Sequence, residues 1–334
     1  MVILCCAGGK VTWADHIDLA TGRPVEAPNI RYEHGASELW PGNLGLHNWP
    51  PMSFSPRTGL VYIPTIESGG RMSDEGIDAR EWKSVPGQFN SGLGPNYGGG
   101  IEPTATTALL AWDPVHRRVV WRAATPVPWN GGTLATAGGL VFQGHIDGNF
   151  TAYDAVTGKQ LWSYPVGNAI LGAPISYRVG GRQYVSVVSA PPAGALVQLD
   201  GANSYGWSYR DHPARLLTFT LDGSAKIPAL PRPAGEKPLH DPSFVVDAKL
   251  AATGSVLYYG CGACHGGAVR SMGSAPDLRA SAVALSPEAF AKVVRGGTLT
   301  ARGMPQFAEL TDADLTALRH YIRAEADRAT SASP

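Results

Sequence analysis

The chain has 334 residues, a length that suggests two domains. Lysine and arginine (27) balance aspartate and glutamate (27), which excludes a general electrostatic attraction to nucleic acid or to an acidic membrane surface. Hydrophobic residues make up 44 % of the chain and can fill sizeable cores, and the 41 glycines and 27 prolines indicate the many turns of an all-β region.

The first residues, Met1 to Gly9, are too few for a secretory signal and lack a basic start. No apolar run has the length of a membrane-spanning helix. The adjacent Cys5 and Cys6 are interpreted as two free thiols at a frayed chain start.

Two segments of residues 1–224 repeat one another, from Ala111 to Trp121 and from Ala152 to Trp162. Each has an apolar strand, an aspartate, a short turn and a second strand that ends in tryptophan, and residues 17–25 form a weaker copy. Further short β runs lie between the copies, so the pattern predicts four strands per unit of about 40 residues, as in a β-propeller. We expect Trp112, Trp121 and Trp162 to pack within the blades.

A proline-rich segment, residues 225–243, predicts a stiff and extended linker. All nine tryptophans lie at or before Trp207. This change in composition divides the chain into a partial β-propeller (residues 1–224), the linker, and a small all-α domain (residues 244–334).

The strongest motif of the chain is Cys261-Gly262-Ala263-Cys264-His265. This spacing is typical of covalent c-type haem attachment, in which two thiols bond the porphyrin and the histidine binds the iron. The alternative is half of a zinc site, but such a site needs two more ligands at matching spacing. We therefore expect Cys261 and Cys264 to hold haem c and His265 to be an axial ligand.

Met304, in a Gly-Met-Pro loop, is the expected second axial ligand, because methionine and histidine together suit electron transfer. Core packing is the alternative role for this side chain. Met272 also competes, but it follows His265 by only seven residues, too few to reach the opposite haem face.

Three helices are expected around these residues. The first runs from Asp247 to Tyr259, the second follows Ser286 with Pro287 in its first turn, and the third runs from Thr311 to about Arg328. Gly254 is placed where it would let the first and last helices cross closely.

Residues 244–328 resemble a class I cytochrome c domain, in which a turn similar to Pro276-Asp277-Leu278 supports the histidine ligand. The preceding region resembles the tryptophan-docked blades of the eight-bladed pyrroloquinoline quinone (PQQ) alcohol dehydrogenases, in segments 46–54, 129–138 and 216–219. Together the two parts resemble a quinohaemoprotein (type II) alcohol dehydrogenase.

This resemblance implies PQQ and a calcium ion near the propeller axis, an aspartate base, and electron transfer through haem c to a further acceptor. Asn48 and Trp49 match the family's PQQ-contacting residues, and the alternative is an asparagine turn at a strand end beside a blade tryptophan. The blades that carry the catalytic aspartate and the calcium ligands have no counterpart here, so no catalytic residue is assigned. The change to Ala190-Pro191-Pro192-Ala193 also puts one PQQ contact in doubt.

Residues 1–224 provide four to five blades at about 40 to 50 residues each, so we expect the C-terminal part of a longer periplasmic enzyme that is incomplete for catalysis by itself. Its partners would be an alcohol, a periplasmic acceptor or a membrane quinone-reducing subunit, and the missing N-terminal half. The alternatives are an electron-carrier cytochrome with a propeller docking module and a non-catalytic scaffold. The histidines outside the haem motif, His145 and His212 among them, are expected on surfaces or loops.

Overall fold

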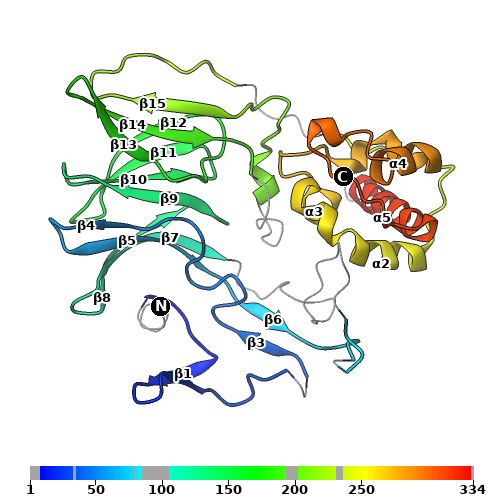
Figure 1. The fold of residues 1–334 in the computed structure, drawn as a ribbon, viewed down its shortest axis with the longest axis horizontal. Helices are drawn as coiled ribbons and strands as arrows, with labels where there is room; N and C mark the ends of the chain where they lie inside the picture. The colour runs from blue at the N-terminus through cyan, green and yellow to red at the C-terminus, as the bar shows by residue number, and fades with distance from the viewer. Residues whose placement is uncertain are drawn as a thin grey trace. The chain divides into compact units, whose positions relative to one another are not determined.

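The computed structural model describes residues 8–32, 35–78, 80–83, 105–192, 202–230 and 236–331. The predictions for Cys5, Cys6 and Ala193 lie outside these residues. The described chain forms two compact units, one with the strands β1 to β15 and the other with the helices α2 to α5 (Figure 1). No helix in the described ranges has the length and apolar character needed to cross a membrane.

All sheets of the strand unit are antiparallel, and the three larger ones are stacked in chain order (Figure 1). The first four-stranded sheet contains β4 (Ser53–Ser55), β5 (Leu60–Glu67), β7 (Thr106–Asp113) and β8 (Arg118–Thr125). The second contains β9 (Asn130–Ala135), β10 (Leu140–His145), β11 (Asn149–Asp154) and β12 (Gln160–Pro165). A three-stranded sheet contains β13 (Ile175–Val179), β14 (Arg182–Ser189) and β15 (Arg215–Phe219). Two-stranded sheets pair β1 (Ala14–Asp18) with β2 (Arg23–Glu26) and β3 (Ser37–Leu39) with β6 (Gly70–Met72).

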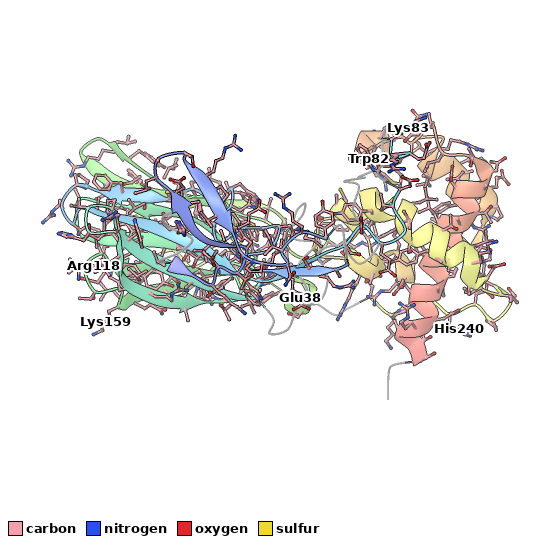
Figure 2. The ribbon with its side chains drawn as sticks, turned by 90° about the horizontal axis from the view of Figure 1, so that it is seen from below. Glu38, Trp82, Lys83, Arg118, Lys159 and His240 are labelled. Atoms are coloured by element: carbon pink, nitrogen blue, oxygen red, sulfur yellow. The ribbon has the colours of Figure 1, made fainter. Side chains whose placement is uncertain are left out.

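The repeated sequence segments form equivalent hairpins, β7–β8 and β11–β12, and the weaker copy forms β1–β2. Asp113, Asp154 and Asp18 each close the turn by accepting a backbone N–H two residues later, at 3.0, 3.0 and 2.8 Å. Such bonds hold the pKa of each carboxyl below its usual value. Figure 2 shows Arg118 and Lys159, which follow two of these turns, at the same end of the unit. The predicted repeat is therefore confirmed.

Trp121 connects one blade to the next. Its indole N–H donates to the carbonyl of Ala155 at 3.2 Å, in the turn between β11 and β12. Gly158 in the same turn has φ +72°, and a β-carbon there would lie 2.6 Å from the indole ring. Glycine is thus required both for the turn and for the approach of the ring. This contact confirms the predicted packing role of Trp121.

The other two repeat tryptophans differ in burial. Trp112 is 6 % exposed and lies in the core beside Ile63 and Leu110. Trp162 is 38 % exposed, and its ring meets Phe150 and Phe219 edge to face, with centroids 5.9 and 5.6 Å apart. Both side chains pack within the blades, as predicted.

Two histidines are buried, His145 and His212. His212 lies in the loop before β15, as expected, whereas His145 lies on a strand, which corrects the expectation of a surface or loop position. His145 ends β10 and is 5 % exposed, and its Nε2 lies 3.1 Å from the hydroxyl of Tyr153 on β11. His212 is 1 % exposed. Burial lowers the pKa of His145 to about 4, although the nearby Asp147 acts in the opposite direction.

This shift makes the strand unit sensitive to acid. Because the pKa of His145 falls from 6.5 to about 4 on folding, the unfolded chain binds the proton first, and stability is lost as the pH falls from about 6.5 to about 4. Between pH 7 and pH 5 we expect the free energy of unfolding to drop by about 2 kcal/mol more in the wild type than in His145→Gln. Urea unfolding followed by tryptophan fluorescence measures this unit. Equal pH slopes in the two proteins would contradict the assignment.

The helical unit contains α2 (Ala248–Leu257), α3 (Tyr259–His265), α4 (Pro287–Val294) and α5 (Asp312–Ser331), with the short 3-10 turns η3 (Gly267–Val269), η4 (Leu278–Ala280), η5 (Ala282–Leu285) and η6 (Thr300–Arg302). The side chain of Asp247 caps α2 and that of Ser286 caps α4, as the sequence predicts. Thr311 and Asp314 cap α5 reciprocally, since each side chain accepts the other's backbone N–H. The expected first helix is divided at Tyr258 into α2 and α3.

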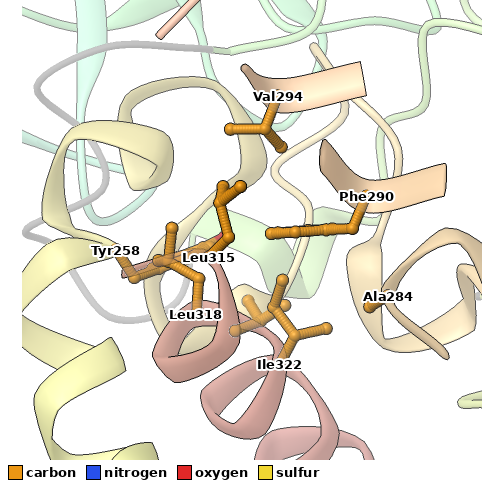
Figure 3. Close-up of a cluster of buried hydrophobic side chains, with 8 residues drawn as sticks. Tyr258, Ala284, Phe290, Val294, Leu315, Leu318 and Ile322 are labelled. Carbon is orange, nitrogen blue, oxygen red and sulfur yellow. The ribbon is translucent and has the colours of Figure 1, made fainter. Parts of the chain in front are cut away.

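The core of the helical unit lies between α4 and α5 (Figure 3). Its buried members are Tyr258, Val269, Ala284, Phe290, Val294, Leu315, Leu318 and Ile322. α2 crosses α5 at Gly254, where a β-carbon would lie 2.1 Å from the carbonyl oxygen of Ala317 and 2.9 Å from Cβ of Tyr321. The close crossing expected at Gly254 is therefore confirmed.

Candidate functional site

The haem motif lies on α3. Cys261 and Cys264 are three residues apart in this helix and so share one of its faces. Cys261 is partly buried and Cys264 is exposed, and neither is in a disulfide. Burial raises the pKa of the Cys261 thiol to about 11.

His265 is the last residue of α3 and is 9 % exposed. Its Nδ1 lies 2.9 Å from the carbonyl oxygen of Pro276. Because a carbonyl can only accept, Nδ1 carries the proton and Nε2 has the lone pair for a metal. Burial lowers the pKa of His265, although the Pro276 carbonyl and Asp277 act in the opposite direction. The imidazole thus has the orientation of a metal ligand.

Met304 follows the turn η6, after Gly303 in the left-handed conformation at φ 91°. Its backbone N–H donates to the carbonyl of Leu299 at 3.3 Å. The side chain is partly buried and packs against the same core cluster as Cys261. Met272, in contrast, is 3 % exposed. The donor set (two thiols, an oriented imidazole and a partly exposed thioether) fits a c-type haem.

Asn48 and Trp49 lie between β3 and β4. The side-chain amide of Asn48 donates to the carbonyl of Leu44 at 2.9 Å, and its oxygen accepts the backbone N–H of Trp49 at 2.9 Å. This is the local asparagine turn that the sequence left open as an alternative. Trp49 is 51 % exposed and its ring lies 5.5 Å from that of Trp129, centroid to centroid.

A small hollow of about 10 Å³ lies beside Asn48. Two buried polar atoms on its wall have no hydrogen-bond partner among the described residues, the indole nitrogen of Trp129 and Oε1 of Gln143. Such atoms cost free energy unless a bound molecule satisfies them. The hollow has room for about one water molecule, far less than a cofactor cavity, so a cofactor could contact these residues only from outside it.

The sequence did not identify Gln143 as a candidate. Its signal is a glutamine that directly follows the apolar residues Leu140 to Phe142 on a strand with buried positions. Trp129 belongs to a segment that carried the family resemblance, but no contact was assigned to it. No group of three or more His, Cys, Asp or Glu side chains in the described part of the chain could hold a metal ion. The described residues therefore do not supply the ligands of a calcium site.

Two family models match the chain. Residues 102–185 match the glucose/ethanol/alcohol dehydrogenase β-propeller domain, and residues 250–322 match cytochrome c oxidase, cbb3-type, subunit III. The two matches confirm the propeller fold of the first part and the cytochrome c fold of the second.

Curated relatives cover nearly the whole chain. Quinohemoprotein alcohol dehydrogenase ADH IIB of Pseudomonas putida is 41 % identical over 318 residues, which are 94 % of this chain and 45 % of the relative. Lupanine 17-hydroxylase [cytochrome c] of a Pseudomonas species is 36 % identical over 93 % of this chain and 44 % of its own length. The chain thus spans less than half the length of these relatives.

A solved structure of quinohemoprotein alcohol dehydrogenase ADHIIG from Pseudomonas putida HK5 matches with a TM-score of 0.81 and 30 % identity, over 97 % of this chain and 48 % of that chain. The enzyme from Comamonas testosteroni matches with a TM-score of 0.75 and 32 % identity, over 97 % and 47 %. The chain is therefore a relative of the PQQ-dependent quinohaemoprotein alcohol dehydrogenases and corresponds to their C-terminal part, the late propeller blades followed by the cytochrome c domain.

Proposed function

We propose that this chain is the haem-bearing C-terminal part of a periplasmic quinohaemoprotein alcohol dehydrogenase, which oxidises alcohols to aldehydes. The observation that carries the proposal is the haem motif on α3, with His265 oriented by Pro276, in a chain related to these enzymes over 94 % of its length. Cys261 and Cys264 would form the thioether links, and His265 and Met304 would ligate the haem iron.

When bound, a c-type haem supplies a one-electron carrier, so the two electrons removed from an alcohol would leave the protein singly. His265 and Met304 would ligate the iron and set its reduction potential. Asn48 and Trp49 would contribute one rim of the PQQ site, where the half-exposed Trp49 ring lies beside that of Trp129. The electrons would pass to a periplasmic acceptor or to a membrane quinone-reducing subunit.

The outer face of the third sheet supports a partner that carries the remaining blades. Ile175, Val188 and Leu216 share this face and are 59, 51 and 71 % exposed. Between the other sheets of this unit, comparable side chains are buried in apolar clusters. A further sheet, from the N-terminal half of the enzyme, would bury these side chains and complete the stack.

The proposal is tested by haem reduction with alcohols. The chain is produced in a host that attaches c-type haem and is supplied with PQQ and calcium, both by itself and fused behind the N-terminal half of the Pseudomonas putida relative. We expect alcohol to reduce the haem in the fusion and not in the chain by itself. The full-length relative is the positive control.

Each failure has a distinct meaning. Colourless protein from that host would overturn the haem assignment. A haem-bearing fusion that no primary alcohol reduces would favour the electron-carrier function, in which the blades dock a partner. Alcohol-dependent reduction by the unfused chain would show that the remaining blades are not needed.

A further inference from the structure

Helix α5 contains a buried arginine that the haem assignment does not use. Arg323 is 2 % exposed. Its guanidinium donates to the carbonyl oxygens of Leu239, Leu278 and Arg279 at 3.0, 3.1 and 3.0 Å. Burial of a charged side chain is costly, so its three carbonyl partners mark a site where the chain is held in one conformation.

These carbonyls belong to two segments that the arginine joins. Leu239 lies in the proline-rich segment before α2, and its N–H also donates directly to the carbonyl of Arg279 at 2.9 Å. Leu278 and Arg279 lie in η4, directly after the turn that contains Pro276. Arg323 therefore fixes the end of the proline-rich segment against the turn that supports His265.

A second set of bonds continues from η4 to the histidine. The Arg279 side chain clasps the carboxylate of Asp277 through two bonds, Nε to Oδ1 at 2.9 Å and Nη2 to Oδ2 at 2.6 Å. Asp277 is 7 % exposed and also caps η4. The preceding residue, Pro276, offers its carbonyl to Nδ1 of His265 at 2.9 Å. Hydrogen bonds between buried or half-buried groups therefore hold Arg279 to Asp277 and Pro276 to His265.

We propose that Arg323 is a positioning residue for the axial histidine. By holding Leu239 and η4 together, it keeps the Pro276 carbonyl in place to accept the proton of His265 Nδ1. This role rests on the proposed haem function. Partners of this kind fix the ring orientation of a ligating histidine and raise its basicity, which stabilises the ferric iron. Loss of Arg323 would therefore raise the haem reduction potential.

Arg319 offers a matched control on the same helix. It is 8 % exposed, and its guanidinium donates to the carbonyls of Ala284 and Leu285 at 2.8 and 2.7 Å, in η5. It is thus a buried arginine with carbonyl partners, but its partners are outside the turn that contains Pro276. Removing either arginine costs stability, whereas only the loss of Arg323 should act on His265.

The test compares the haem midpoint potentials of Arg323→Met and Arg319→Met with that of the wild type, in the haem-bearing full chain. For Arg323→Met we expect the ferrous-to-ferric ratio at a fixed poise to rise by about threefold or more, or roughly 28 mV at 59 mV per tenfold. For Arg319→Met the ratio should change less. Arg323→Lys, which keeps the charge, should restore part of the wild-type value.

Haem content distinguishes a failure of the proposed haem function from a failure of the inference about Arg323. If the wild-type protein contains no haem, the proposed function is wrong. If Arg323→Met and Arg319→Met both contain haem and have equal midpoint potentials, this inference is wrong. Should Arg323→Met lose its haem while Arg319→Met retains it, Arg323→Lys decides. That variant keeps the charge but loses the guanidinium that spans the three carbonyls, and a wild-type potential in it would overturn the inference.

Discussion

Gly254→Ala is expected to destabilise the cytochrome unit by about 3 kcal/mol or more. The added methyl would lie 2.1 Å from the carbonyl oxygen of Ala317 and 2.9 Å from Cβ of Tyr321. The nearer obstacle is helix backbone, which no rotamer change can move, so α2 and α5 must separate. Alanine gains about 1 kcal/mol in helix propensity over glycine, which is too little to offset this.

Thermal unfolding followed by helical circular dichroism, together with the yield of haem-bearing protein, measures the effect. Ser255→Ala is the control, because Ser255 is the next residue on the exposed side of α2 and should change stability by no more than about 0.5 kcal/mol. A Gly254→Ala protein as stable as this control would show that the two helices do not cross at this position.

Met304→Leu is expected to lower the haem reduction potential by on the order of 100 mV or more, because axial ligands set this potential over a wide range. Leucine has nearly the volume of methionine and preserves packing against the core, so the loss is that of the sulfur. The change in iron ligation should also alter the ferrous absorption spectrum.

Met272→Leu is the matched control. Met272 is 3 % exposed, so the substitution should leave both the potential and the spectrum close to those of the wild type. If Met272→Leu changes them and Met304→Leu does not, the sixth ligand has been assigned to the wrong methionine.

The helix ends and hairpins of this chain were predictable because their signals are local. Asp247, Ser286 and Thr311 cap helices through bonds to backbone groups within the next few residues. The turns at Asp113 and Asp154 depend on bonds of similarly short range. A side chain that satisfies its nearest neighbours can be identified without knowledge of the rest of the fold.

The buried histidine and the hollow were harder to predict because they depend on residues distant in sequence. His145 ends an otherwise ordinary strand, and its burial follows from packing that no local pattern reveals. Gln143 and Trp129 lie fourteen residues apart along the chain, and their lining of one hollow with Asn48 follows only from the stacking of the sheets. The division between α2 and α3 was likewise missed, because both segments have helical composition.

The contact between Trp121 and the turn at Gly158 imposes an order on biosynthesis. A ribosome makes the chain from its N-terminus, so β8 is complete while Ala155 and Gly158 have yet to be translated. Until Ala155 and Gly158 leave the ribosome, the Trp121 indole lacks this hydrogen-bond and packing partner and remains in water or in a transient contact. The sheet that contains β8 is therefore completed only after β11 and the turn that follows it have been made.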